Sequence, residues 1–134
     1  MISNASPALP TGLRLFIVVP SLLAIGFGVW HFTVPTVWNW WSAIRPEATE
    51  LVLAVRAINT LFSLLLTLHG VVTILLSLRR PVERFALGLL LAASVVLWGC
   101  RVGLQVVSPQ GAQIPGVAPA MLSIFIALLA TYAV

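Results

Sequence analysis

The chain has 134 residues, of which 60% are hydrophobic and 7% are charged. A soluble domain carries about 25% charged residues, so the composition excludes the soluble class and indicates an integral membrane protein. The net charge of +4 reflects a scarcity of acids rather than a basic face, and nucleic-acid binding is not expected. Cys100 is the only cysteine, which rules out an intrachain disulfide and a CxxC redox pair.

The first predicted helix follows a polar lead. Residues 1–12 contain two prolines and are expected to be disordered. A long uncharged window starts after Arg14 and predicts a membrane-spanning helix over residues 13–32. Because only one basic residue precedes this window and no small-x-small cleavage site follows it, we interpret it as a retained helix and not as a signal peptide.

The longest connection covers residues 33–46 and contains Trp38, Trp40 and Trp41. Tryptophan prefers the headgroup level of a bilayer, so this loop is predicted to lie at the membrane interface. A second helix is predicted over residues 47–78, because 22 residues without formal charge separate Arg56 from Arg79.

The second helix carries one polar stripe. At 100° per residue, five of its polar side chains fall close to one line along the helix: Arg56, Asn59, Thr60, Ser63 and Thr67. A spanning helix is expected to turn such a stripe away from lipid. The stripe therefore predicts a polar seam inside a bundle.

The third helix is predicted over residues 82–107, after a basic turn at residues 79–81. Ser94, Arg101 and Gln105 fall on one side of it. The opposite side is formed by small residues, namely Gly88, Ala92, Gly99 and Gly103. Small residues let helices approach closely in lipid. Since opposite faces cannot both look into one bundle, we expect the small-residue face to contact a second copy or a partner subunit.

A fourth helix is predicted over residues 115–134, after a turn at residues 108–111. The sequence thus predicts an all-α, single-domain bundle of four transmembrane helices in up-down order. Four arginines fall on one side of the membrane and one on the other: Arg14, Arg79, Arg80 and Arg84 against Arg45. The positive-inside rule then places both termini in the cytoplasm, and a bacterial inner membrane is the expected location.

Helix geometry brings polar residues from three segments to one level. At 1.5 Å per residue, His31, Asn59 and Arg101 each lie about 25–30 Å from the cytoplasmic boundary. We therefore predict a pocket at the extracytoplasmic end of the bundle, roofed by the tryptophan loop, with two arginines as its walls. The candidate ligand-binding residues are His31, Trp38, Trp41, Arg56, Asn59, Ser63, Arg101 and Gln105.

The two arginines also have a simpler interpretation. Arg56 and Arg101 both lie near helix ends, where a long cationic side chain can reach the headgroups at little cost. If Arg101 instead points inward, its candidate partners are Glu50, Asn59 or a ligand anion, because an unpaired buried guanidinium is costly.

Catalytic and cofactor chemistry have few candidates. No carboxylate pair, catalytic triad or metal cluster stands out, and no catalytic residue is assigned. His31 and His69 raise the alternative of bis-histidine haem, but they lie at different depths. A packed His69 bonded to a carbonyl group is the favoured interpretation.

Residues 24–105 resemble the DoxX-like family of small four-helix membrane proteins. The resemblance is carried by AIGFGVWHFTVPTVWNWWSAIRP, ELVLAVRAINTLFSLLLTL and RRPVERFALGLLLAASV. The family's Gly-x-x-His-Phe-x-x-Pro motif is matched by Gly28, His31, Phe32 and Pro35. The family usually has a glutamate where Asn59 stands, so its acid chemistry is not carried over. The resemblance implies a subunit of a quinone- or sulfur-linked redox system or an assembly factor, with quinone as a possible ligand.

Three functions follow from these observations. The first is an accessory or binding protein whose pocket holds a lipid-like or quinone-like molecule or a partner's segment. A transporter or channel is the alternative, although the polar stripe ends near Thr67 and does not cross the whole bilayer. An enzyme acting on a lipid or quinone is third, because no acid, base and nucleophile set is visible.

Overall fold

The computed structural model describes residues 9–45, 47–79 and 82–133. All regular elements in these residues are helices: α1 (Thr11–His31), α2 (Val34–Val37), the 3₁₀ helix η1 (Trp40–Ala43), α3 (Thr49–Leu78), α4 (Arg84–Val107) and α5 (Val117–Tyr132). Most of the predicted polar lead and two of the three residues of the predicted basic turn lie outside the described residues. The all-α prediction is confirmed for the described part of the chain.

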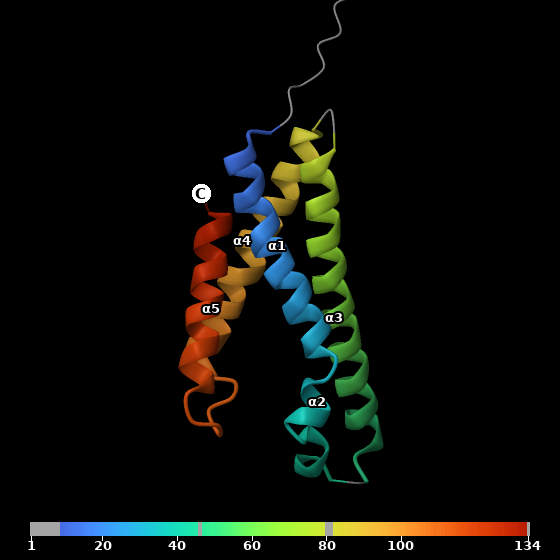
Figure 1. Cartoon of the computed structure of the whole chain (residues 1–134). Coiled ribbons are helices and arrows are strands. Elements are labelled where there is room, and N and C mark those ends of the chain that lie inside the picture. Colours follow the sequence, from blue (N-terminus) through green and yellow to red (C-terminus); the bar gives the residue numbers. More distant parts are fainter. Residues whose placement is uncertain (1–8, 46, 80–81, 134) are drawn as a thin grey trace, which may run out of the picture.

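The four longer helices form a bundle in which consecutive helices run in opposite directions (Figure 1). Three of them, α1, α3 and α4, are long and apolar enough to cross a membrane. Many of their large apolar side chains are exposed, as lipid contact requires. These features define a multi-pass helical membrane protein.

The last helix is shorter than the sequence predicts. α5 has 16 residues, which corresponds to about 24 Å, whereas a bilayer core is about 30 Å thick. The predicted span over residues 115–134 is therefore wrong in its length. Gly116 has a φ of +79°, a left-handed conformation that cannot belong to a right-handed helix, and α5 starts only after it.

The tryptophan segment contains two helical turns where the sequence predicts only a connection. Pro35 lies in the first turn of α2, where its missing N–H is not needed. Asn39, with a φ of +51°, separates α2 from η1. Helix α3 then begins at Thr49, so Glu50 lies in its first turn and Glu47 precedes it.

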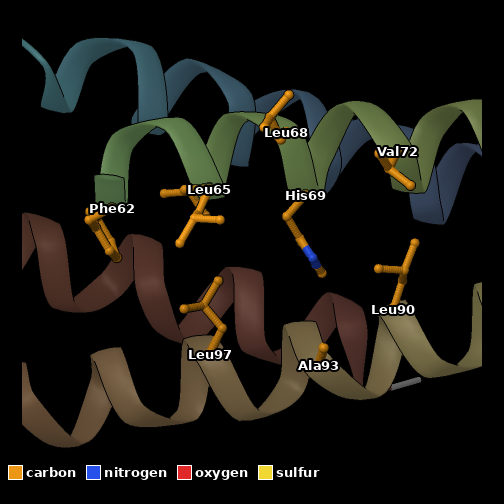
Figure 2. A pocket seen from close by; sticks show the side chains of 9 residues that line it. Phe62, Leu65, Leu68, His69, Val72, Leu90, Ala93 and Leu97 are labelled. Carbon is orange, nitrogen blue, oxygen red and sulfur yellow. The ribbon is translucent and has the colours of Figure 1, made fainter. Parts of the chain in front are cut away.

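Helices α1 and α3 form the closest pair, and α4 packs against α5. Two glycines allow the first contact. A Cβ atom added to Gly28 would lie 2.5 Å from Oγ1 of Thr67, and one added to Gly70 would lie 2.8 Å from the carbonyl oxygen of Ser21. Helices α3 and α4 contact each other much less than α1 and α3 do, and a groove lies between them (Figure 2).

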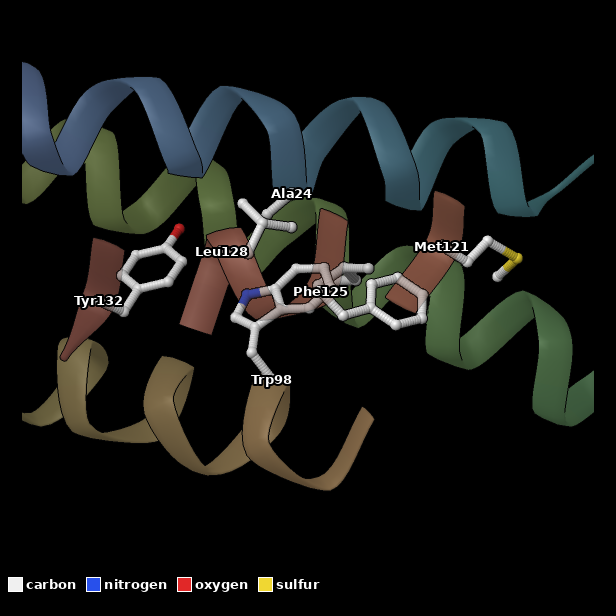
Figure 3. Packing of buried hydrophobic residues seen from close by; sticks show 7 residues of the cluster. Ala24, Trp98, Met121, Phe125, Leu128 and Tyr132 are labelled. Atoms are coloured by element: carbon white, nitrogen blue, oxygen red, sulfur yellow. The ribbon is translucent and has the colours of Figure 1, made fainter. Parts of the chain in front are cut away.

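A core of seven buried residues joins all four longer helices (Figure 3). Its members are Ala24, Leu66, Trp98, Met121, Phe125, Leu128 and Tyr132. The hydroxyl group of Tyr132 lies 3.1 Å from Oγ of Ser21, so a hydrogen bond connects α5 to α1. Leu66 of the core also lines the groove, as does Phe62, which packs against the core.

Gly28→Ala is expected to lower the free energy of unfolding by about 1–3 kcal/mol, because the new methyl group forces α1 away from α3. Gly26→Ala is the matched control, since Gly26 is exposed and a Cβ there would meet nothing within 4 Å. Thermal unfolding in detergent measures both variants. Equal effects at the two positions would contradict the close contact at Gly28.

Candidate functional site

A cavity of about 390 Å³ lies at the end of the bundle that carries the tryptophan segment. Its polar lining comes from His31 of α1, Asn59 of α3, Arg101 of α4 and Gln110 of the α4–α5 connection. The remaining lining is largely apolar and aromatic, from Trp40, Val55, Ile58, Phe62 and Leu104. The structure thus brings three of the predicted site residues, His31, Asn59 and Arg101, around one cavity.

His31 and Asn59 form a paired contact between the end of α1 and α3. Nδ1 of His31 lies 2.8 Å from Oδ1 of Asn59, and Nδ2 of Asn59 donates to the backbone carbonyl of His31 at 3.1 Å. Because an amide oxygen only accepts, Nδ1 carries the hydrogen of this bond. The other ring nitrogen, Nε2, is not used by any hydrogen bond among the described residues, and is therefore available to a ligand.

Arg101 is buried, with 8% of its surface exposed. Its Nη2 donates to Oε1 of Gln110 at 2.9 Å. Its guanidinium carbon lies 4.7 Å from the ring centre of Phe125 and 5.9 Å from those of Phe27 and Phe62. The buried Nε atom has no hydrogen-bond partner in the described part of the chain. Arg101 therefore points inward, with three aromatic rings and one neutral acceptor around it.

Gln105 holds the connection that supplies Gln110. Nε2 of Gln105 donates to the carbonyl oxygens of Gln110 and Ala118 at 3.0 and 3.2 Å, and Oε1 accepts the backbone N–H of Gln110 at 3.2 Å. Gln105 is buried and is not among the residues that line the cavity. Its role is to position Gln110, which in turn bonds Arg101.

Other predicted site residues lie outside the cavity. Arg56 is exposed, and its guanidinium carbon lies 5.0 Å from the ring centre of Trp41, so Arg56 does not form a second cationic wall. Trp38 packs against Trp30 and Trp40, with ring centres 5.8 and 6.5 Å apart. The tryptophan that lines the cavity is Trp40.

Ser63 is buried on the face of α3 that meets α1. Its Oγ donates to the carbonyl oxygen of Asn59 at 2.7 Å, and its own carbonyl would lie 3.0 Å from a Cβ at Gly28. Ser63 therefore belongs to the helix contact and does not line the cavity.

Residues of the site that were not predicted from the sequence include Gln110, Trp40 and Phe62, which line the cavity, and Phe125, whose ring lies next to Arg101. Gln110 belongs to a segment that signals only a turn, and nothing in that signal shows that its side chain folds back onto α4. Phe62 and Phe125 are indistinguishable by composition from lipid-facing residues. The one signal in the sequence is Arg101 itself. If this arginine on α4 points inward, aromatic rings on α3 and α5 are expected to pack against its guanidinium group.

His69 makes a contact of a different kind. Its Nε2 lies 2.7 Å from Oγ of Ser94, which itself donates to the carbonyl oxygen of Leu90 at 2.9 Å. Since the hydroxyl hydrogen is used by Leu90, Nε2 of His69 carries the hydrogen of the first bond. His69 is thus packed as expected, but its partner is a serine hydroxyl instead of a carbonyl.

Comparison with protein-family models, curated sequences and solved structures finds no match to this chain. The helices and the cavity define the class of this protein. It is a multi-pass helical membrane protein with a partly polar cavity near one end of its spans. The resemblance to the DoxX-like family stays a prediction.

Proposed function

We propose that this protein is a membrane-embedded binding protein whose cavity holds the oxygen-bearing head group of a lipid-like or quinone-like molecule. The observation that carries the proposal is Arg101, a buried cation whose hydrogen bond goes to the neutral Gln110 and whose Nε has no partner among the described residues. A buried charge without an opposite charge is costly, so its retention favours a role in ligand binding.

The chemistry of the cavity supports an amphiphile. Arg101 offers a planar set of N–H donors that suits a carboxylate, a phosphate or a quinone carbonyl. His31 also lines the cavity, and its Nε2 forms no hydrogen bond among the described residues. The apolar side chains of Val55, Ile58 and Leu104 occupy other parts of the wall. A ligand with both polar and apolar parts satisfies this lining better than a fully hydrated one.

The position in the membrane is part of the proposal. Arg14 and Arg84 lie near the end of the bundle opposite the cavity, as Arg79 does, and the positive-inside rule makes that end cytoplasmic. The cavity then faces the extracytoplasmic side of a bacterial inner membrane. Both termini of the bundle are cytoplasmic in this arrangement.

An accessory role is the proposed biological setting. By its resemblance to the DoxX-like family, the protein serves a quinone- or sulfur-linked redox system or acts as an assembly factor, with any electron transfer in the partner. The small-residue face of α4 is the proposed contact surface. Gly88, Ala92 and Gly103 are exposed, and a Cβ at Gly88, Gly99 or Gly103 would meet nothing within 4 Å.

The hydroxyl groups of α3 favour binding over conduction. Ser63, Thr67 and Thr73 each donate to the carbonyl group four residues earlier on their own helix, at 2.7–2.8 Å. These hydroxyls are used within the helix, and Ser63 and Thr73 are fully buried. They do not provide the water-lined path that a transporter or channel needs.

Mass spectrometry of co-purifying molecules tests the proposal. The protein is purified from its native membrane in mild detergent as wild type, Arg101→Met and Arg56→Met. We expect a lipid or quinone to accompany the wild type and Arg56→Met, and to be absent from Arg101→Met. Arg56 is the matched control because it is an arginine near the same end that does not line the cavity.

Two outcomes would contradict the proposal. One is a molecule retained by Arg101→Met at the wild-type ratio. The other is robust ion or solute flux through wild-type liposomes, which would favour the transporter interpretation instead.

A further inference from the structure

A second hollow of about 460 Å³ lies between α3 and α4, directly beside the cavity. Figure 2 shows apolar side chains of the two helices facing each other across it, with His69 in the middle of the row. Phe62 lines both the cavity and this groove, so the two hollows share a wall. The head-group site and the apolar groove therefore adjoin at Phe62.

The groove is apolar except at His69, whose Nδ1 forms no hydrogen bond among the described residues. The Nε2–H of His69 is satisfied by Ser94, which removes the cost of a free donor facing hydrocarbon. The other lining residues of α3 and α4 are leucine, valine, phenylalanine and alanine. A hydrocarbon chain is the chemistry that fits this lining.

The groove has a definite direction and length. On α3 it runs from Phe62 to Val72, ten residues or about 15 Å of helix. On the antiparallel α4 it runs from Leu97 back to Leu90. Arg101 lies one turn beyond Leu97, so the polar end of the combined site is at the Arg101 side and the groove leads away from it toward the membrane centre.

We propose that the cavity and the groove bind one single-chain amphiphile, with its head group at Arg101 and its hydrocarbon chain between α3 and α4. This rests on the proposed function, and it adds the class of ligand and a preference for chain length. One wall of the groove is formed by α3 and the other by α4. A chain of about 15 Å or more fills the groove, and a shorter chain leaves part of it empty.

Photolabelling in vesicles tests this proposal. The probe is a palmitic acid analogue with a diazirine at mid-chain, in phosphatidylcholine vesicles that contain the full chain. We expect saturable labelling of residues 62–72 and 90–97, reduced by excess palmitic acid and not by butyric acid. The reduction of labelling by decylubiquinone is compared with the reduction by palmitic acid. The competitor that reduces labelling more shows whether a quinone or an anionic head group binds better.

A matched pair of alanines separates the groove from the general lipid surface. Ala93 lines the groove, whereas Ala127 of α5 does not; both are exposed, so a larger side chain is tolerated at either position. Ala93→Phe is expected to reduce the saturable labelling at least about 5-fold, with a smaller reduction for Ala93→Leu. Ala127→Phe is expected to label as the wild type does.

The variants distinguish the failure of each proposal. If Arg101→Met abolishes saturable labelling and Ala93→Phe leaves it unchanged, the head group binds as proposed and the chain lies elsewhere. If Arg101→Met labels as the wild type does, the proposed function fails at its head-group site. Labelling that no competitor reduces would overturn both.

Discussion

Replacing Asn59 with leucine is expected to lower the free energy of unfolding by about 1–3 kcal/mol, since two hydrogen bonds between α1 and α3 are lost together. Nδ1 and the backbone carbonyl of His31 both lose their partner, and His31 is buried. Leucine has nearly the shape of asparagine, so packing changes little. Thermal unfolding in detergent or in nanodiscs measures the effect.

Thr60→Leu is the control for Asn59→Leu. Thr60 is the next residue on α3 and is exposed, so leucine there is expected to change the free energy of unfolding by no more than about 0.5 kcal/mol. A similar loss of stability in both variants would show that the paired contact contributes nothing.

Replacing Arg101 with methionine is expected to separate stability from binding. Binding of the amphiphile should weaken at least about 30-fold, because loss of a buried charged donor costs about 2 kcal/mol or more. Thermal stability should stay the same or rise, since methionine removes a buried charge whose one hydrogen-bond partner among the described residues is the neutral Gln110, and retains contact with the phenylalanine rings. Gln110 is exposed and can bond water in this variant.

Arg101→Lys completes the test. Lysine keeps the charge but loses the planar guanidinium, its stacking on Phe125 and its geometry toward Gln110, so an intermediate affinity is expected. If Arg101→Met loses stability and binding in proportion, Arg101 is a structural residue and the binding proposal is contradicted.

The spans and the level of the site follow from the sequence, because both depend on simple quantities. Uncharged windows define the long helices, and a constant rise per residue brings His31, Asn59 and Arg101 to one depth. These quantities do not show which side of each helix faces the interior of the bundle. Arg56 lies about one turn before Asn59, and Thr60 is the next residue after it. Both are exposed, whereas Asn59 is buried.

The buried stripe of α3 explains this difference. It consists of Asn59, Ser63, Leu66, Gly70, Thr73 and Ser77. These residues continue past the middle of the helix with small side chains, which is typical of a helix-packing face rather than of a pocket wall. The spacing of Gly70, Thr73 and Ser77 is visible in the sequence, and it would have indicated that the polar seam of α3 packs against α1.

The division of the bundle into two close pairs, α1 with α3 and α4 with α5, has a consequence for exchange. The groove between α3 and α4 includes the exposed side chains of Leu65 and Leu68, which face lipid in a membrane, so a molecule bound as proposed enters from within the leaflet and not from water. Its occupancy is then set by its mole fraction among the lipids, and not by its concentration in solution. Uptake would slow in a more ordered bilayer even when the dissolved amount stays constant.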